Sequence, residues 1–382
     1  MCMIVAILIV LLLVTAGLLS LFYYDIKNYI ISRRIKKTEK TLSQERVSIG
    51  AFKKELIDAT KYLVVNGKQI AYPAFYSENF FKRFKLNLKD QYAVQRFDYD
   101  GSECGWPFYA LLKEDVEFGR KMFDEKVLNL DIHAVDQSPY GMVALYLYDK
   151  FKDEKYLKYA QQLYKFIVDL ETNYGIAYRQ YHKNDIILVD TLGMAIPFLI
   201  EYGNYSKDDA AIKLAEKTIE CYLQYGCDSS TGVPAFSYRI STPHIKCGYA
   251  NWGRGCAWFV IGLSYINIEH LDAKSQKLVG VLEETLKSMW ESQGLFGQFI
   301  SEWSHDLSAE LPIVYYLYKM NIIRIDEKQL LAYSTMCHDG IMYNCSSANV
   351  GIVKQGFPYG PNMLGQGYML RLIQLYEERN AK

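Results

Sequence analysis

The feature that most constrains the fold is a repeat of about 55 residues that runs through most of the chain. Small residues open an apolar run five times, marked by Tyr140, Gly193, Gly255, Ala309 and Gly365, and the steps between these markers are 53, 62, 54 and 56 residues. Each opening run is apolar nearly all round, which indicates a helix buried on most sides. An amphipathic helix with apolar residues at helical spacing follows it. Each repeat therefore predicts a helical hairpin with a buried inner helix and a half-exposed outer helix.

Residues 47–382 have room for about six such hairpins. No long linker interrupts this region and strand-like alternation is nearly absent from it, so we expect one all-α domain rather than two. Six hairpins that close on themselves form an (α/α)6 toroid, and an open solenoid is the alternative. The toroid is favoured because polar, aromatic-rich connections precede the small-residue openings, as the rim of an active site requires.

The N-terminus predicts a membrane anchor. Residues 1–24 contain no charged side chain, and as a helix they would extend about 36 Å, enough to cross a hydrocarbon core of about 30 Å. A cleaved secretory signal is the alternative, but the basic residues follow the apolar run instead of preceding it. We expect residues 25–46 to be a basic juxtamembrane stalk. Its Lys and Arg outnumber its acidic residues, which predicts that the large C-terminal domain lies in the cytoplasm under the positive-inside rule.

Charge and cysteine content exclude other classes of protein. Lys plus Arg and Asp plus Glu both number 43, so the chain carries no overall field that would attract nucleic acid. The eight cysteines include no CxxC pair and no His/Cys cluster with zinc-ligand spacing, which favours free thiols and no metal. We expect neither a nucleic-acid partner nor a cofactor.

Two aspartates are candidates for acid and base chemistry. Asp136 and Asp190 each lie at or just before the start of a predicted inner helix, 54 residues or one repeat apart. In a toroid this spacing places both carboxylates on one rim, on adjacent inner helices. The alternative is that each is an N-cap, because Asp is among the commonest capping residues.

The segment 251–258, with sequence NWGRGCAW, is a candidate binding element. Trp252 and Trp258 bracket Arg254, and glycines between them allow close approach of a ligand. A guanidinium can bind a carboxylate through two hydrogen bonds while an indole stacks on a sugar ring. The alternative is ordinary packing, with Trp258 inside a helix and Arg254 paired with a rim carboxylate.

Three ordered motifs, residues 189–199, 252–258 and 358–367, resemble those of the unsaturated glucuronyl and rhamnogalacturonyl hydrolases, glycoside hydrolase families 88 and 105. The similarity extends from about Asp136 to the C-terminus. It implies a six-hairpin (α/α)6 barrel that removes a 4,5-unsaturated uronic acid from an oligosaccharide end without a metal. In these families the reaction begins with protonation at C4 of the vinyl ether and addition of water at C5.

The resemblance also implies roles for individual residues. Asp190 matches the general acid/base aspartate, and Asp136 matches the second aspartate one hairpin earlier. The implied substrate-binding residues are the tryptophan and arginine element, a His-Lys pair before the catalytic aspartate and a tyrosine of the C-terminal motif: Trp252, Arg254, Trp258, His182, Lys183 and Tyr359.

The chain departs from the family pattern at two places. Cys256-Ala257 replaces the usual Asn-Gly, and a histidine that many members carry after the third hairpin has no clear match. We therefore keep two alternatives: a uronate C5-epimerase, and a non-catalytic module that binds acidic glycans. The expected partners are an acidic oligosaccharide or polysaccharide and, through the N-terminal helix, a membrane, which would suit surface-polysaccharide metabolism.

Overall fold

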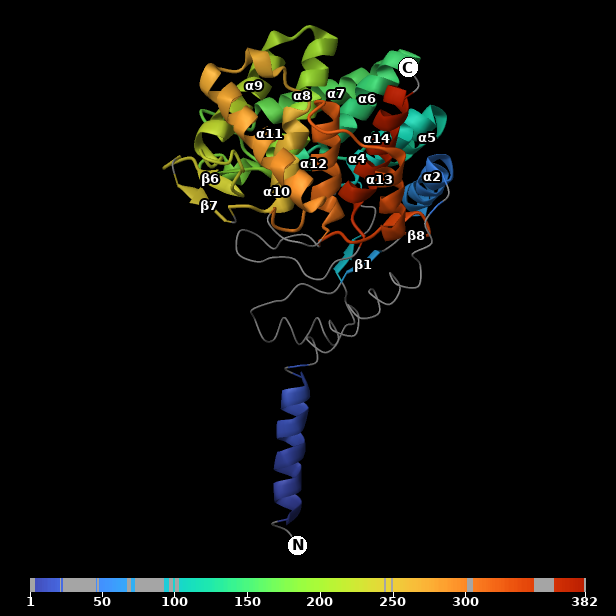
Figure 1. The fold of residues 1–382 in the computed structure, drawn as a ribbon, viewed down its shortest axis with the longest axis vertical. Helices are drawn as coiled ribbons and strands as arrows, with labels where there is room; N and C mark the ends of the chain where they lie inside the picture. The colour runs from blue at the N-terminus through green and yellow to red at the C-terminus, as the bar shows by residue number, and fades with distance from the viewer. Residues whose placement is uncertain are drawn as a thin grey trace.

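The computed structural model describes residues 4–20, 22, 46, 48–66, 70–72, 93–95, 99, 103–243, 245–248, 250–300, 305–346 and 361–380. Within them, helices form a closed ring in which each inner helix packs against the next and the last packs against the first (Figure 1). In chain order the ring consists of α4 (Gly105–Glu114), α6 (Ser138–Phe151), α8 (Asp190–Ser206), α10 (Gly253–Leu263), α12 (Leu307–Lys319) and α14 (Met363–Asn380). The predicted toroid is confirmed, because an open solenoid would leave α4 and α14 apart.

A second layer of helices surrounds the ring. It contains α2 (Ile49–Asn66), α5 (Val116–Lys126), α7 (Glu154–Val168), α9 (Asp209–Tyr225), α11 (Ala273–Gln293) and α13 (Glu327–Ala332). Five of these outer helices begin at an aspartate whose side chain accepts a backbone N–H of the first turn, which satisfies a donor that the helix leaves unpaired: Asp115, Asp153, Asp208, Asp272 and Asp326. The caps fix where each outer helix starts, and the buried apolar stripes fix which side faces the ring.

The connections contain short helices and strands that the sequence pattern did not predict. The 3-10 helices are η1 (Val135–Gln137), η2 (Gln180–His182), η3 (Ile268–His270) and η4 (Tyr333–Met336). The antiparallel strands are β1 (Ile70–Tyr72), β2 (Ala93–Gln95), β3 (Glu171–Thr172), β4 (Gly175–Ile176), β5 (Ile186–Leu188), β6 (Ser237–Arg239), β7 (Lys246–Cys247), β8 (Cys337–His338) and β9 (Ile341–Met342). Strands of two or three residues are too short to give a visible alternation of apolar and polar residues.

One sheet joins the connections that lead into two neighbouring inner helices. Strands β5, β6 and β7 pair side by side, with Ile187 opposite Tyr238. The N–H of Val189 donates to the carbonyl of Phe236 at 3.0 Å, which continues this pairing to the residue before α8. The sheet therefore holds the start of α8 in a fixed position relative to the loop before α10.

The inner helices approach each other closely at small residues. A Cβ on Gly193 of α8 would lie 2.5 Å from Cε3 of Trp258 and 2.7 Å from its carbonyl oxygen on α10. Only a residue without a side chain fits there. Gly193, one of the residues that mark the repeat, is thus a contact point between two ring helices.

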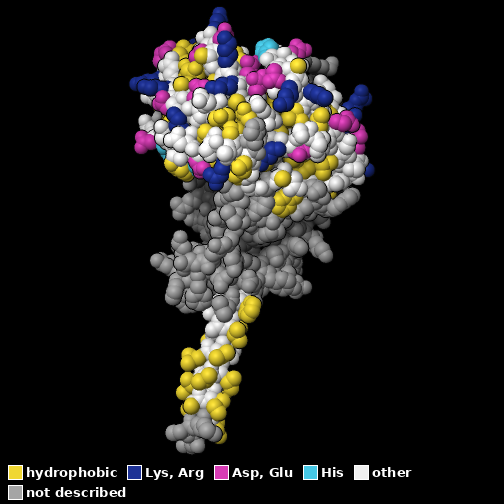
Figure 2. Space-filling model, turned by 90° about the vertical axis from the view of Figure 1, so that its left-hand side faces the viewer, with side chains coloured by type: hydrophobic (Ala, Val, Ile, Leu, Met, Phe, Trp, Pro, Cys, Tyr) yellow, Lys and Arg dark blue, Asp and Glu magenta, His cyan; other side chains and the backbone are white. Residues whose placement is uncertain are grey.

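The N-terminal prediction falls on residues that are described only in part. Residues 4–20 are helical and their apolar side chains are exposed, as Figure 2 shows for this helix. Among the described residues, we find no helix that combines the length and the apolar character needed to cross a membrane. The predicted stalk lies outside the described residues except for Arg46.

On the face of the body seen in Figure 2, cationic and anionic side chains are interspersed.

Candidate active site

The candidate site lies where the N-terminal ends of the inner helices meet. Four charged side chains come together there: Glu103 precedes α4, Asp136 precedes α6, Asp190 opens α8 and Arg254 lies in the first turn of α10. Arg254 and Glu103 are hydrogen-bonded at 2.8 Å, and Arg254, Asp136 and Glu103 all act electrostatically on Asp190. The two predicted carboxylates therefore lie at one end of the ring, Asp136 just before α6 and Asp190 at the start of α8, the next inner helix.

Asp190 has the properties of a carboxylic acid that holds a proton near neutral pH. Its pKa is raised to about 7, mainly because burial disfavours the charged form. A hydrogen bond from its own backbone N–H and the charge of Arg254 lower the pKa, whereas the charges of Asp136 and Glu103 raise it. Its Oδ2 is buried without a hydrogen-bond partner among the described residues, although the residue as a whole keeps some accessible surface. Such a group can donate a proton at pH 7.

Asp136 is more completely enclosed and both of its oxygens are engaged. The residue is 2% exposed. Its Oδ1 accepts a short hydrogen bond from the Tyr178 hydroxyl, and its Oδ2 accepts one from Nη2 of Arg179 at 2.9 Å. Burial raises the pKa of Asp136, and the contacts with Tyr178 and Arg179 oppose that rise. Asp136 is therefore held in place, unlike Asp190, whose Oδ2 has no such partner.

The N-cap alternative does not describe either aspartate. Val189 occupies the N-cap position of α8, and no side-chain capping bond is made there. A true cap at the same end of the ring is Asp306, whose Oδ1 accepts hydrogen bonds from the N–H and the hydroxyl of Ser308 at the start of α12. The contrast shows that Asp136 and Asp190 are not needed to begin their helices.

Arg254 pairs with a rim carboxylate, as the alternative interpretation held. Its side chain is 2% exposed, its Nη1 donates to Oε1 of Glu103 at 2.8 Å and its Nη2 donates to Oγ of Ser346 at 3.3 Å. Nδ2 of Asn362 donates to the other oxygen of Glu103 at 2.6 Å. The prediction of a guanidinium fork open to a substrate carboxylate is therefore corrected: Nη1 is engaged by Glu103, a residue that precedes the family motifs, and Nη2 by Ser346.

The two tryptophans differ in position. Trp258 is 1% exposed and packs against Gly193 inside the ring, so it supports α10 instead of offering a face to a sugar. Trp252 is the N-cap residue of α10, 4% exposed, with its ring 5.3 Å from that of Phe236. Its indole N–H is buried without a partner among the described residues, and the Arg254 guanidinium lies 5.7 Å from its ring. Of the two, Trp252 is the one placed beside the charged group.

The remaining predicted residues are only partly brought to the site. His182 lies near Tyr178, with ring centroids 6.2 Å apart, and burial lowers its pKa. Lys183 is directed elsewhere: its Nζ donates to the carbonyl of Asp169 at 2.6 Å, and it lines a separate pocket of about 480 Å³. Tyr359 lies outside the described residues.

The sequence analysis did not identify Glu103, Tyr178 and Arg179. Tyr178 and Arg179 lie one residue beyond the end of β4, in a stretch where nothing distinguishes them from the other tyrosines and arginines of the chain. Glu103 is separated from Arg254 by 151 residues, so local spacing gives no sign of the pairing. The repeat itself was the available signal, because it places the residue before each inner helix at the same rim.

A closed ring of helical hairpins that carries at one end a carboxylic acid with a pKa near neutrality, beside a second buried carboxylate, fits the glycosidases built on an (α/α)6 barrel. The family model described as Glycosyl Hydrolase Family 88 matches residues 108–345, which is more than half of the chain. The protein therefore belongs to glycosyl hydrolase family 88 and is a glycosidase.

Solved structures agree on the fold. A possible member of the GH105 family from Klebsiella pneumoniae subsp. pneumoniae superposes with a TM-score of 0.67 at 16% identity, covering 88% of this chain and 96% of that one. The unsaturated glucuronyl hydrolase of Bacillus sp. GL1, described as responsible for the degradation of glycosaminoglycan, gives 0.61 at 14% identity, with 85% and 95% covered. The unsaturated glucuronyl hydrolase of Streptococcus agalactiae gives 0.59 at 14% identity, with 89% and 96% covered. Among curated proteins, none matches the chain.

Proposed function

We propose that this glycosidase removes a 4,5-unsaturated uronic acid from the end of an oligosaccharide by hydrating the vinyl ether. Asp190 donates its proton to C4, and water adds to C5 as it returns a proton to the Asp190 carboxylate. The product is a hemiketal at C5, which opens to a ketone and leaves a hemiacetal at C1. The hemiacetal collapses to an aldehyde at C1 and releases the rest of the oligosaccharide as an alcohol. The reaction consumes one water and needs no metal or cofactor. Asp190 gives up one proton and regains one, so it is protonated again at the end of the cycle.

The observation that carries this proposal is the state of Asp190. A vinyl ether needs a proton donor before water can add, and a carboxyl with a pKa of about 7 and an unpartnered Oδ2 supplies one near neutral pH. An ordinary exposed aspartate, with a pKa of 3.8, would be ionised there. Family membership and the activity of a structural neighbour, an unsaturated glucuronyl hydrolase, support the same substrate class.

Asp136 assists through its charge and through its neighbours. Its negative charge contributes to the raised pKa of Asp190, and the contacts with Tyr178 and Arg179 fix its position. Tyr178 is also close enough to Asp190 for the two groups to interact electrostatically. We therefore assign Asp136 and Tyr178 as positioning residues that keep Asp190 protonated.

The test uses the loss of ultraviolet absorbance of the conjugated double bond when the full chain is incubated with lyase-generated oligosaccharides. We expect loss with the wild type and none with Asp190→Asn. Asp228→Asn, which removes an exposed carboxylate in the loop before β6, is the matched control and should retain activity. Mass spectrometry separates the alternatives, because hydration adds one water and divides the chain, whereas epimerisation leaves the mass unchanged. Full activity of Asp190→Asn would contradict the assignment.

We also propose that residues 1–24 anchor the enzyme in a membrane with the catalytic domain on the cytoplasmic side. The support is the absence of charge in this segment, the exposed apolar side chains of residues 4–20 and the basic residues that follow. The full chain should stay with membranes after alkaline carbonate extraction, and a chain lacking residues 1–24 should not. Protease added outside sealed cells should leave the domain intact; its digestion there would reverse the orientation.

A further inference from the structure

A second pocket lies outside the ring of inner helices. Its volume is about 580 Å³, within the usual range for small-molecule sites. It is lined by the C-terminal end of α11, the loop before α12, the first turn of α12, α13 and η4. None of the charged residues of the candidate active site contributes to it.

The polar wall of the pocket contains a histidine held by a buried glutamate. Nδ1 of His305 and Oε2 of Glu310 lie 2.7 Å apart, and the Glu310 side chain is fully buried. Glu310 also accepts hydrogen bonds from the Tyr333 hydroxyl at 2.7 Å and the N–H of Phe296 at 3.3 Å. Three separate segments thus fix one carboxylate, and the carboxylate fixes the imidazole. Since Nδ1 is engaged, Nε2 is the ring nitrogen left for a ligand.

The other lining residues favour a polyhydroxylated ligand without charge. Trp290 supplies an aromatic side chain, with its ring parallel to that of Phe296 within 15°. Gln329, Thr335 and Glu291 supply an amide, a hydroxyl and a carboxylate. The lining residues that the structure describes include two glutamates, Glu291 and Glu310, and no lysine or arginine, which disfavours an anion. An aromatic ring beside several hydrogen-bonding groups suits the apolar face and the hydroxyls of a sugar.

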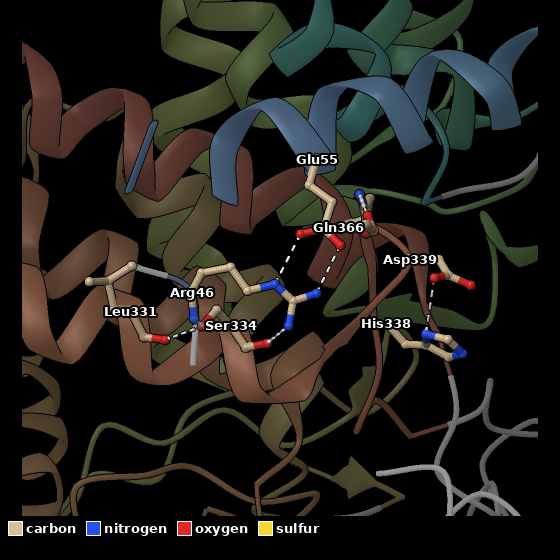
Figure 3. A network of polar contacts seen from close by, with 8 residues as sticks. Arg46, Glu55, Leu331, Ser334, His338, Asp339 and Gln366 are labelled. Carbon is tan, nitrogen blue, oxygen red and sulfur yellow. Dashed lines mark hydrogen bonds and ion pairs between the residues drawn. The ribbon is translucent and has the colours of Figure 1, made fainter. Parts of the chain in front are cut away.

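Arg46, which precedes α2, is hydrogen-bonded to Ser334 of η4, between two lining residues of the pocket (Figure 3). The backbone N–H of Arg46 donates to Oγ of Ser334 at 3.2 Å, and its Nη1 donates to the Ser334 carbonyl at 3.3 Å. The guanidinium also makes two hydrogen bonds to Glu55 of α2, at 3.0 and 2.8 Å. Ser334 lies between Tyr333 and Thr335 in η4, so these contacts hold the pocket lining in place before any ligand arrives.

We propose that this pocket binds an uncharged hexose ring as an accessory sugar site, separate from the active site. The side chains that contact the sugar are Trp290, through its ring, and His305, through Nε2. Arg46 is a positioning residue for η4. The inference does not depend on the proposed function, because a saturated neutral sugar has no double bond to hydrate and needs neither Asp136 nor Asp190.

Saturation-transfer NMR on the full chain in detergent tests the proposal, with methyl β-D-glucopyranoside, methyl β-D-galactopyranoside and methyl β-D-glucuronide as probes. At least one neutral glycoside should receive saturation from the wild type and equally from Asp190→Asn. Trp290→Leu should abolish the signal, and Tyr181→Leu, which removes a tyrosine that is 74% exposed and does not line the pocket, should not. The glucuronide should show no transfer that depends on Trp290.

Two further variants, one at His305 and one at Arg46, guard against misfolding. His305→Asn retains a donor at the Nδ1 position for Glu310 but lacks Nε2, and it should weaken binding by roughly 3- to 10-fold, the effect of one lost hydrogen bond. Arg46→Ala should weaken binding of the sugar less than His305→Asn does. It should leave turnover of unsaturated uronides unchanged. The proposal is overturned if neither neutral glycoside receives saturation, or if transfer survives in both Trp290→Leu and His305→Asn.

Discussion

Replacing Asp190 with Asn should stabilise the protein at high pH even as it removes the proposed acid. The pKa of the Asp190 carboxyl is about 7, against 3.8 for an ordinary aspartate, because burial disfavours its charged form. The unfolded chain therefore loses this proton at about pH 4, whereas the folded chain keeps it up to about pH 7. Between those values the folded state binds more protons than the unfolded state, so the free energy of unfolding falls as the pH rises.

The size of the effect follows from the two pKa values. A difference of about 3 between them corresponds to about 4 kcal/mol of unfolding free energy. Because the residue keeps some accessible surface, solvent screens part of this cost, and we expect about 2 kcal/mol. Asn cannot ionise, so the variant should be about 2 kcal/mol more stable than the wild type at about pH 8.5 and equally stable at about pH 4.

Urea unfolding followed by far-ultraviolet circular dichroism across this pH range measures the difference. Asp228→Asn is a control of opposite sign: hydrogen bonds from Ser230 and Thr231 lower the pKa of Asp228 to about 2, so its charged form stabilises the fold above about pH 4. That variant should gain no stability at high pH. The argument is refuted if Asp190→Asn gains nothing at about pH 8.5, or if its gain is the same at both pH values, which would indicate packing instead of charge.

Three further substitutions test the surroundings of the site. Glu103→Gln leaves the buried Arg254 guanidinium without its carboxylate, so it should lower the free energy of unfolding in urea by about 3 kcal/mol. Tyr178→Phe removes the hydroxyl that donates to Asp136 and should lower kcat roughly 10-fold with little change in KM, measured by absorbance loss. Gly193→Ala places a methyl group 2.5 Å from the neighbouring ring helix and should cost about 1–3 kcal/mol, visible as a lower Tm in calorimetry.

The architecture could be predicted from sequence because it depends on periodic features. The steps between small residues gave the number of hairpins, and the apolar runs distinguished inner from outer helices. Asp136 and Asp190 were found because each occupies the same place in its repeat. These signals are local in the sequence, so they can be recognised without knowing which segments pack together.

The errors concern contacts between distant segments. Arg254 was predicted to bind a substrate carboxylate, but Glu103 and Ser346, from opposite ends of the domain, take its hydrogen bonds. Trp258 was predicted to contact a sugar, but a tryptophan in an apolar run is equally suited to the core, where the structure places it. Lys183 follows η2 and turns toward Asp169. In each case the residue type was compatible with two environments, and only the packing decides between them.

Closure of the ring has a consequence for how the chain is made. Asn362 donates to Glu103 across 259 residues, and Gln374 of α14 donates to the carbonyl of Ala110 in α4 across 264 residues. Until the last inner helix leaves the ribosome, α4 and α12 each present an uncovered apolar flank, so the growing chain is vulnerable to aggregation throughout most of its synthesis. A premature stop codon before α14 should therefore yield a product for chaperones and proteases, and not a smaller working barrel.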